Sequence, residues 1–457
     1  MAERNFSAIT PEIRKLTALC AANDIIDKEL YIKHKVNRGL RDLDGNGVLT
    51  GLTEISEIIA KKEVDGKLLP CEGNLYYRGY NVKDLVKGYM NDDRFGFEEV
   101  IYLLLIGHLP DVAALQNFTE LLGSYRSLPP KFSRDIIMKA PSADIMNSLS
   151  RSVLTLYSYD SNADDTSVEN VLRQSLQLIS MFPMLAVYGY QAMNYYIKNS
   201  NSFFLHEPDP SLSTAENILM MLRDDRSYSQ LEAKVLDLAL ILHAEHGGGN
   251  NSTFTTHVVT SSGTDTYSAI ASALGSLKGP KHGGANIKVC HMFDNIMKNL
   301  QDWNDDDEVS CYLQKILNKQ AFDQSGLIYG VGHAIYSVSD PRAVIFREFV
   351  KKLCIEKGME KEFSLYAKVE ELAPKIIAEH RKMYKGVSIN VDFYSGFVYR
   401  MLGIPEELFT PLFAIARIAG WSAHRMEELV NAGKIIRPAY LAVSERRDYI
   451  PLSERYK

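Results

Sequence analysis

Four histidines of this chain stand in glycine-rich stretches where a side chain could meet a ligand. They are His243, His246, His282 and His333. Glycine has no side chain, so a backbone rich in glycine lets a ligand approach closely. Imidazole changes protonation near neutral pH and can donate or accept a hydrogen bond, which suits acid–base chemistry or the polarisation of a carbonyl group. These histidines are therefore the first candidates for a reactive site.

His243 and His246 lie at the end of an apolar helical pattern that starts at Val235 and stops at the glycines 247–249. The pattern predicts a helix that these glycines terminate, with His246 facing a space. The i, i+3 spacing could bind a metal, but the zincin motif His-Glu-x-x-His places glutamate directly after its first histidine. A hydrogen-bonded structural pair is the other alternative, because a neutral imidazole needs only one donor and one acceptor.

His282 and His333 each lie between glycines in a predicted loop. His282 belongs to Gly-Pro-Lys-His-Gly-Gly-Ala-Asn at 279–286, and His333 follows Gly-Val-Gly at 330–332. A histidine held between glycines seldom serves packing. Each loop taken alone is a weak sign of a site, since glycine-rich loops are common.

Asp392 stands where a strand-like run, 387–391, gives way to a helical pattern. One interpretation is a helix N-cap, for which aspartate is a favoured residue. The other is a general base. A helix dipole would lower the pKa of this carboxyl group, whereas burial beside a ligand would raise it, and only a raised pKa suits a base near neutral pH.

Arg417 has apolar residues on both sides through more than two turns of a predicted helix. Arginine is almost never buried without a partner. The partner is either an internal carboxylate or an anionic substrate that the guanidinium group binds bidentately. Arg342 and Arg437 are two further arginines set against turns, in Asp-Pro-Arg and Ile-Ile-Arg-Pro.

The elements that must position these residues are predicted to be helices. Apolar residues recur at helical spacing in 97–106, 235–242 and 408–421, and alternating strand-like runs are few. The sequence therefore predicts a mainly α fold. Residues 1–37 predict a polar amphipathic helix, and short strands are expected around 66–80.

Composition and charge limit the classes of function. The chain has 457 residues, 46% apolar and 24% charged, as ordinary globular proteins do, and could form two domains. A net charge of −6 gives no general attraction for nucleic acid or anionic lipid, so an anionic ligand would need a local basic cluster. The scattered cysteines predict neither disulfides nor a zinc ribbon. With no visible secretory signal or bilayer-spanning stretch, we expect a cytoplasmic protein.

In this order, the motifs resemble the citrate synthase family. The resemblance covers about residues 70–440 and rests on His-x-x-His-x-Gly-Gly-Asn ending at Asn250, Gly-Pro-x-His-Gly-Gly-Ala-Asn at 279–286, Gly-x-Gly-His-x-x-Tyr with Asp-Pro-Arg at 330–342, and Val-Asp-Phe-Tyr-Ser-Gly at 391–396. It implies condensation of acetyl-CoA with oxaloacetate and hydrolysis of the citryl thioester. No cofactor or metal is expected, because acetyl-CoA is itself a substrate.

The resemblance also implies a role for each site residue. Asp392 would be the base, His282 would hydrogen-bond the thioester carbonyl, and His333 would polarise the keto carbonyl of oxaloacetate. Substrate-binding roles carry over to His246, Asn250, Arg342, Arg417 and Arg437. In the family the last of these arginines comes from the partner subunit, so a homodimer is expected.

The fold that the resemblance implies is a two-domain helical one, with a large domain and a small mobile domain around the active-site cleft. We expect a large domain at 70–284 and 401–457, a small domain at 285–400, and an N-terminal appendage at 1–69. Closure of the small domain would exclude water during the reaction.

Some positions depart from the family pattern. Ala334, Ser337 and Ala439 stand where basic residues are found in family members. These departures concern recognition of the CoA phosphates, for which Lys278, Lys281 and Arg347 are possible substitutes.

Three other functions remain open at this point. A 2-methylcitrate synthase would share these residues and use propionyl-CoA, and one methylene group gives only about 1–3 kcal/mol of discrimination. A metal-dependent hydrolase would use His243 and His246. A family member without activity could act as a binding or regulatory protein.

Overall fold

The computed structural model describes residues 7–42, 47–333, 335–381, 386–431 and 433–455. The chain forms two compact units, residues 1–52 and residues 53–457. Within the described residues, no helix is long and apolar enough to cross a membrane. The predicted division into an appendage, a large domain and a small domain stays a prediction.

The described residues of the first unit form two α-helices where the sequence predicted one. Helix α1 (Pro11–Asn23) begins with proline after the N-cap Thr10, and α2 (Lys28–Lys33) is capped by the side chain of Asp27. The single predicted helix over 1–37 is therefore wrong, because Asp27 satisfies the backbone of a new helix start. None of the described residues of this unit is buried.

The second unit begins with a β-hairpin. Strand β1 (Ser56–Val64) pairs antiparallel with β2 (Lys67–Tyr77), and the short β3 (Tyr80–Asn81) pairs with the end of β2. Asp65 and Gly66 connect the strands with positive φ angles of 51° and 71°, as a two-residue hairpin turn requires. Strands were expected only around 66–80; β1 was missed.

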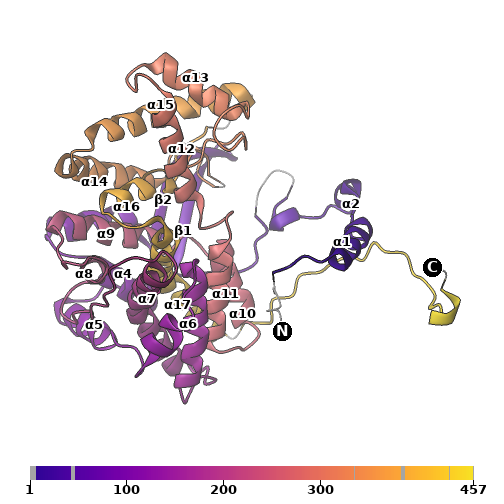
Figure 1. Cartoon of the computed structure of the whole chain (residues 1–457), viewed down its shortest axis with the longest axis horizontal. Coiled ribbons are helices and arrows are strands. Elements are labelled where there is room, and N and C mark those ends of the chain that lie inside the picture. Colours follow the sequence, from indigo (N-terminus) through magenta and orange to yellow (C-terminus); the bar gives the residue numbers. More distant parts are fainter. Residues whose placement is uncertain (1–6, 43–46, 334, 382–385, 432, 456–457) are drawn as a thin grey trace. The chain divides into compact units, whose positions relative to one another are not determined.

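Helices make up most of the remaining chain, which confirms the predicted mainly α fold (Figure 1). Those that follow the hairpin are α3 (Val82–Asn91), α4 (Phe97–Ile106), α5 (Val112–Ser124), α6 (Ile145–Leu156), α7 (Val168–Tyr196), α8 (Thr214–Leu222), α9 (Gln230–His243), α10 (Asn251–Thr260) and α11 (Thr266–Lys278). The later helices are α12 (Ala285–Asn299), α13 (Asp306–Leu317), α14 (Pro341–Lys357), α15 (Glu360–Arg381), α16 (Asp392–Met401) and α17 (Phe409–Val430). Short helical turns occur at Ser133–Met138, Tyr157–Tyr159, Glu406–Leu408 and Leu452–Glu454.

Helix α17 is the centre of the core. Every residue from Phe409 to Arg425 is buried, and the helix packs against α4, α7, α9, α10 and α11. Such a helix is apolar on all sides because it is surrounded by others. Arg417, in its middle, is therefore carried into the interior of the unit.

Helices α12 to α16 pack mainly on one another, at the top of Figure 1. Helix α12 packs against α16, α13 against α15, and α14 against both α15 and α16. Helix α14 also contacts α9 and β2. The segments that carry Arg342 and Asp392 are thereby placed beside the end of α9, where His243 and His246 lie.

Candidate active site

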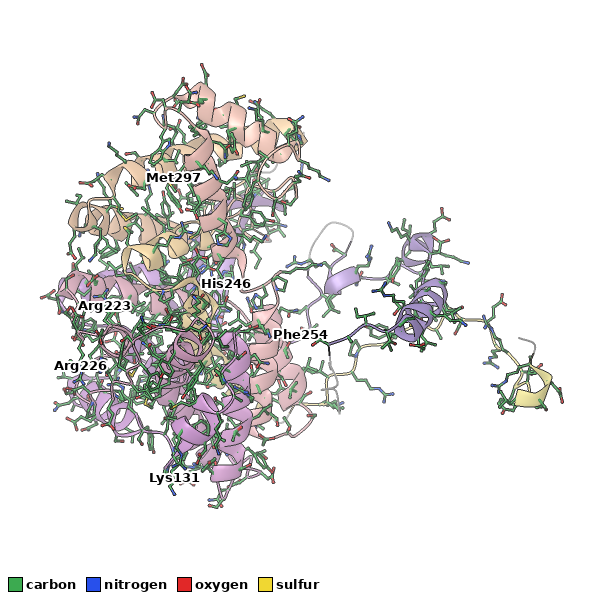
Figure 2. All side chains as sticks on the ribbon, in the orientation of Figure 1. Lys131, Arg223, Arg226, His246, Phe254 and Met297 are labelled. Carbon is green, nitrogen blue, oxygen red and sulfur yellow. The ribbon has the colours of Figure 1, made fainter. Side chains whose placement is uncertain are left out.

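Two buried histidines lie at the end of helix α9 and just after it; His246 is labelled in Figure 2. A capping box of Ser229 and Glu232 starts this helix. It ends at His243, a few residues before the glycines that were predicted to terminate it, so His246 lies after the helix end. His243 is fully buried and His246 is 6% exposed. Both ring nitrogens of His243 and Nε2 of His246 lack a hydrogen-bond partner among the described residues. The pKa of each imidazole is held well below its usual value, first by burial and then by the charge of Arg342.

His282 lies in a tight loop between α11 and α12. Its backbone N–H donates to the carbonyl of Gly279 at 2.8 Å. A Cβ at Gly283 would lie 2.4 Å from the carbonyl oxygen of Leu277, so only glycine fits there. Burial and then the charge of Arg417 lower the pKa of His282 to about 4, which keeps this imidazole neutral near pH 7.

The hydroxyl of Ser252 orients the His282 ring. Ser252 Oγ lies 3.1 Å from His282 Nε2, accepts the indole N–H of Trp421 at 3.1 Å, and lies 3.0 Å from Asn250 Oδ1. Asn250 is the N-cap of α10, and its side chain accepts the backbone N–H of Ser252. Asn250, predicted to bind substrate, therefore also holds the residue that positions His282.

The loops that carry His333 and Asp392 pair with each other. Gly332 N–H donates to the carbonyl of Ser388 at 2.7 Å, and Asn390 N–H donates to the carbonyl of Gly330 at 2.9 Å. Gly330 has φ +78°, and a Cβ there would lie 3.0 Å from Phe393. This pairing brings together two segments that are far apart in the sequence.

Backbone hydrogen bonds fix the tautomer of His333. Its Nδ1 accepts the N–H groups of Ile335 and Tyr336, at 3.0 and 3.2 Å. A nitrogen that accepts carries no hydrogen, so Nε2 of the neutral ring is the N–H donor. The ring meets that of His246 edge to face, with centroids 5.3 Å apart. Ala334, one of the departures from the family pattern, lies outside the described residues.

Asp392 is the first residue of α16. The N-cap is Val391, and no side chain caps this helix, so the N-cap interpretation of Asp392 is wrong. The backbone N–H of Asp392 donates instead to Asn390 Oδ1 at 3.0 Å. Burial raises the pKa of the half-buried Asp392 carboxyl to about 6, although Arg342 and Arg417 oppose the rise. A raised pKa is the property that a general base near neutral pH requires.

Arg342 is buried and paired with the N-cap of its own helix. Asp340 caps α14, and Pro341 occupies the first helical position. The guanidinium of Arg342 donates to both carboxylate oxygens of Asp340, from Nε at 3.0 Å and from Nη2 at 2.7 Å. The Asp-Pro-Arg turn of the sequence is therefore a helix start that also fixes an arginine.

Arg417 is fully buried, yet no carboxylate lies within 4.0 Å of it among the described residues. Its Nε donates to the carbonyl of His243 at 2.7 Å, and its guanidinium lies 4.7 Å from the centroid of the Phe413 ring. Neither Nη1 nor Nη2 has a hydrogen-bond partner among the described residues. Burial lowers the pKa of Arg417 to about 10, so the group stays charged at pH 7. The internal carboxylate whose charge acts most on Arg417 is Glu245, which makes no direct ion pair with it among the described residues.

Arg437 is not brought into this cluster by the single chain. It is exposed in the extended segment after α17. The backbone N–H of Ile436 donates to Ser261 Oγ, at the C-terminal end of α10. Asn250 caps the other end of that helix, about 15 Å away for a helix of this length.

The basic residues considered for the CoA phosphates are on the surface. Lys278 pairs with Asp144 at 2.7 Å, and Nε of Arg347 lies 3.4 Å from Glu370. Lys281 is exposed next to His282. Their surface positions do not test contacts with the CoA phosphates, so these contacts stay predictions.

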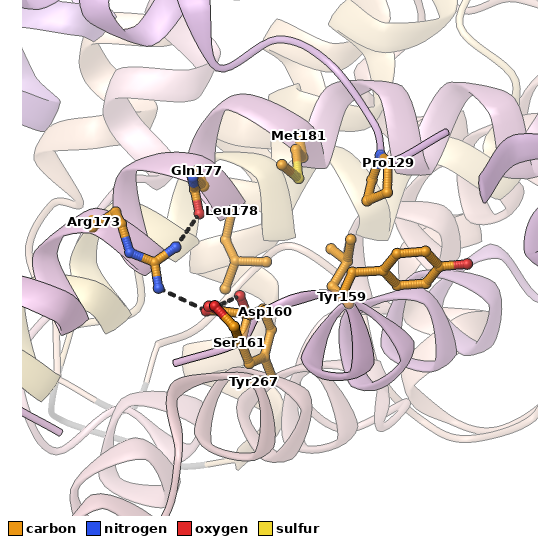
Figure 3. Close-up of a pocket in the computed structure, with 10 residues that line it drawn as sticks. Pro129, Tyr159, Asp160, Ser161, Arg173, Gln177, Leu178, Met181 and Tyr267 are labelled. Atoms are coloured by element: carbon orange, nitrogen blue, oxygen red, sulfur yellow. Dashed lines mark hydrogen bonds and ion pairs between the residues drawn. The ribbon is translucent and has the colours of Figure 1, made fainter. Parts of the chain in front are cut away.

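A cavity of about 230 Å³ lies elsewhere in the unit (Figure 3). Its polar lining groups pair with one another, so we assign it no ligand. Asp160 Oδ2 accepts hydrogen bonds from Arg173 at 2.7 Å and from Tyr267 at 2.8 Å. Arg173 also donates to Gln177 at 2.8 Å. No buried polar side-chain atom among the described lining residues lacks a partner, in contrast to the cluster around His243 and Arg417.

Sequence reasoning missed Ser252, Asp340 and Trp421. Asp340 belongs to the Asp-Pro-Arg motif, in which an aspartate directly before a proline is a signal for a helix N-cap. Ser252 and Trp421 are contacts between distant segments, for which one sequence offers no signal. The predicted metal alternative gains no support, since the described residues contain no group of three or more His, Cys, Asp or Glu that could hold an ion.

Comparisons with known proteins agree with this geometry. The family model described as "Citrate synthase, C-terminal domain" matches residues 43–439. Citrate synthase from Synechocystis sp. is 34% identical over 86% of this chain and 90% of its own length. 2-Methylcitrate synthase 1 from Corynebacterium glutamicum is 33% identical over 92% of this chain and 99% of its own length.

A solved structure is similar over the same range. It is the ternary complex of carboxymethyl coenzyme A and oxaloacetate with citrate synthase from Thermoplasma acidophilum, with a TM-score of 0.74 at 27% identity, covering 92% of this chain and 99% of that one. Fold, motifs and relatives agree, and this chain belongs to the citrate synthase family.

Proposed function

We propose that this protein is a citrate synthase, which condenses acetyl-CoA with oxaloacetate and hydrolyses citryl-CoA to citrate and CoA. The observation that carries the proposal is the buried guanidinium of Arg417, whose two Nη groups have no protein partner among the described residues. A buried charge with free donors suits an anionic substrate. Citrate synthases among the relatives support the same activity.

Oxaloacetate would be held by its two carboxylates. Arg342 and Arg417 are the arginines in the cluster, and guanidinium groups match the planar geometry of carboxylates. His246, 6% exposed and with an unpartnered Nε2, offers a further contact. Arg437, exposed on the segment after α17, would act in the site of a second copy of the chain, so we propose a homodimer.

Asp392 would remove a proton from the methyl group of acetyl-CoA. A thioester methyl is a very weak carbon acid, so the enolate oxygen must be stabilised while the base acts. His282 would provide this hydrogen bond as a neutral imidazole. The single hydroxyl hydrogen of Ser252 can point to Asn250 Oδ1 or to His282 Nε2, and donation to Nε2 leaves Nδ1 as the N–H donor.

His333 would polarise the keto carbonyl of oxaloacetate. Its Nδ1 accepts two backbone N–H groups, so Nε2 carries the hydrogen of the neutral ring and would donate it to the carbonyl oxygen. The enolate carbon then attacks the keto carbon, and the new alkoxide takes up a proton. Water finally adds to the citryl thioester, the carbon–sulfur bond breaks, and the CoA thiol leaves with a proton.

A 2-methylcitrate synthase is the second candidate, because relatives with that name are about as similar as the citrate synthases. Release of CoA thiol, measured with oxaloacetate and either acetyl-CoA or propionyl-CoA, separates the two. We expect kcat/KM to be higher with acetyl-CoA, by a factor on the order of 10 to 200. A preference for propionyl-CoA would establish the second candidate. Thiol release that does not depend on oxaloacetate would overturn both.

A further inference from the structure

Four titratable side chains form a hydrogen-bonded row behind the glycine loop that follows His246. Glu245 Oε1 lies 3.1 Å from His424 Nε2, His424 Nδ1 lies 3.1 Å from His257 Nε2, and His257 Nδ1 lies 2.9 Å from Glu428 Oε2. The side chains of Glu245 and His424 are fully buried, and those of His257 and Glu428 are 15% and 17% exposed. The proposed reaction uses none of them.

The row needs one more proton than two neutral imidazoles contain. Three hydrogen bonds link the four groups, so three hydrogens are required. Ionised carboxylates donate none, and each neutral imidazole donates one. The complete row therefore holds a third N–H on the two histidines and has a net charge of −1. Without that proton, one contact sets two lone pairs against each other in a buried place, which is costly.

Charged groups around the row act on this extra proton in both directions. Burial raises the pKa of Glu245, but His424 and then Arg417 outweigh burial and bring it to about 2, so this carboxylate is ionised. Glu427 Oε2 lies 3.8 Å from His424 Nδ1 and adds negative charge beside the row. Burial and the neighbouring His424 lower the pKa of His257, whereas Glu428 raises it.

Groups on other elements face the ends of the row. Tyr77 on β2 donates to the backbone carbonyl of Glu245 at 3.1 Å, and Ser56 on β1 donates to its Oε1 at 3.0 Å. The backbone N–H of Glu54 donates to Glu427 Oε1 at 2.7 Å, and the charge of Arg78 also acts on Glu427. Arg417 is the cation that opposes the extra proton, and it acts on the Glu245 end.

One end of the row fixes the backbone on both sides of His246. Glu245 Oε1 accepts the backbone N–H of Gly247 at 2.5 Å, and Gly247 has φ +84°, which favours glycine. A Cβ at Gly248 would lie 3.5 Å from the ring of His424. His246 Nε2 has no hydrogen-bond partner among the described residues, so the direction of this ring depends on the backbone at 245–247 together with its ring contacts to His333 and Tyr336.

The other end of the row reaches the segment that carries Arg437. Gly433 N–H donates to the carbonyl of Glu428 at 3.5 Å, and a Cβ at Gly433 would lie 2.1 Å from Glu428 Oε1. The row therefore runs from the loop of one proposed oxaloacetate contact, His246, to the base of the segment that holds another.

We propose that Glu245, His424, His257 and Glu428 form a relay that holds one extra proton and positions His246 for the dicarboxylate substrate. Loss of the extra proton as the pH rises breaks one of its hydrogen bonds and weakens substrate binding. All four are positioning residues, since none of them faces the reacting atoms. The inference rests on the proposed function only for its kinetic test.

The variant Glu428→Gln tests the proton count. A glutamine amide can donate to His257 Nδ1, His257 Nε2–H can donate to His424 Nδ1, and His424 Nε2–H can donate to Glu245. All three hydrogen bonds then form with two neutral imidazoles. We expect the KM for oxaloacetate of the unaltered protein to rise about tenfold as the proton is lost, the size of one buried hydrogen bond. In Glu428→Gln the KM is expected to be independent of pH.

Two further variants separate positioning from general damage. Glu427→Gln changes the adjacent carboxylate, which is outside the row. The KM is still expected to rise with pH in this variant, but the rise should begin at lower pH because a negative charge beside His424 is lost. His257→Leu removes the central link and is expected to raise the KM for oxaloacetate about tenfold at pH 7, the size of one buried hydrogen bond, with kcat changed less. A KM in Glu428→Gln that follows pH as in the unaltered protein would overturn the proposal, as would an unchanged KM in His257→Leu.

Ring ¹⁵N NMR of histidine-labelled protein tests the relay without using activity. We expect three protonated nitrogens on His257 and His424 at pH 7, and two in Glu428→Gln. Two neutral rings in the unaltered protein would overturn the relay even if the enzyme condenses acetyl-CoA with oxaloacetate. Three protonated nitrogens in a protein without that activity would keep the relay and reject the proposed function.

Discussion

Asp340 and Arg342 form a buried bidentate ion pair, with Arg342 Nη2 2.7 Å from Asp340 Oδ2 and Nε 3.0 Å from Oδ1. The same Oδ2 accepts the backbone N–H of Val391 at 3.2 Å. Val391 immediately precedes Asp392, so one carboxylate holds both a proposed substrate arginine and the segment of the proposed base. The carboxylate of Asp340 therefore positions both the proposed substrate contact and the proposed base.

Asp340→Asn should therefore impair binding and catalysis together. Breaking a buried ion pair by changing one partner costs about 3–5 kcal/mol, because the remaining charge is left buried. We expect a lower Tm and a KM for oxaloacetate raised at least about tenfold, measured by thermal unfolding and steady-state kinetics. Asp135→Asn is the matched control, since Asp135 pairs with Arg134 through two bonds of 2.9 Å at the surface, where a pair contributes about 0–1 kcal/mol. Equal effects of the two changes would contradict the role of Asp340.

Arg417→Lys should weaken oxaloacetate binding, because a lysine cannot replace the two free Nη groups in one plane. We expect the KM for oxaloacetate to rise on the order of 100-fold, as losing charged hydrogen bonds of about 1.5–3 kcal/mol implies. Arg425→Lys is the control from the same buried helix.

Arg425 differs from Arg417 in having protein partners for its guanidinium. It donates to the hydroxyl groups of Thr266 and Thr260 and to the carbonyl of Thr264, at 3.3, 3.1 and 2.8 Å. Arg425→Lys should therefore lower the Tm and change the KM for oxaloacetate little. If Arg425→Lys raised the KM for oxaloacetate as much as Arg417→Lys, the proposal that Arg417 binds oxaloacetate would be contradicted.

The pH profile should show an acid limb near pH 6. Burial raises the pKa of Asp392 to about 6, and a base must be ionised, so kcat/KM for acetyl-CoA should rise with pH and reach half its plateau near pH 6. The pKa of His282 is lowered to about 4, which adds no further limb above pH 5. Activity that stays constant from pH 5 to pH 8 would count against Asp392 as the base.

The same shift predicts the opposite effect on stability. The pKa of Asp392 in the folded protein, about 6, exceeds its ordinary 3.8, so the folded state binds this proton more tightly than the unfolded state. Rising pH therefore destabilises the fold between about pH 4 and pH 6, by on the order of 1–3 kcal/mol in total. Asp392→Asn should raise the Tm at pH 7.5 but not at pH 4. A lower Tm at pH 7.5 would mean that the carboxylate stabilises the fold.

Much of this site could be predicted from the sequence because its signals are local. Helix α9 ends at His243, close to the predicted end at the glycines 247–249, and the helical spacing around Arg417 places it in the core. The two interpretations of Asp392 could not be separated from sequence, since a shift of one residue decides between a cap and the first helical position. Only the structure shows Val391 at the cap.

The relationships that could not be predicted connect distant segments. The pairing of Gly330 and Gly332 with 388–390 joins the loop that carries His333 to the segment that leads into Asp392, and nothing in either segment encodes its partner. The row from Glu245 to Glu428 could not be predicted either, because its members come from three separate parts of the chain. Single sequences carry propensity and periodicity, whereas such contacts depend on how whole helices pack.

The most direct test of the proposed reaction compares Asp392→Asn with the unaltered protein in thiol release from acetyl-CoA and oxaloacetate. Asparagine keeps the shape of the side chain but cannot accept the methyl proton, so we expect kcat to fall on the order of 10² to 10⁴ while the affinity for oxaloacetate is retained. Asp307→Asn, at an exposed position on α13, is the control. An Asp392→Asn protein with undiminished kcat would contradict the assignment of Asp392 as the base.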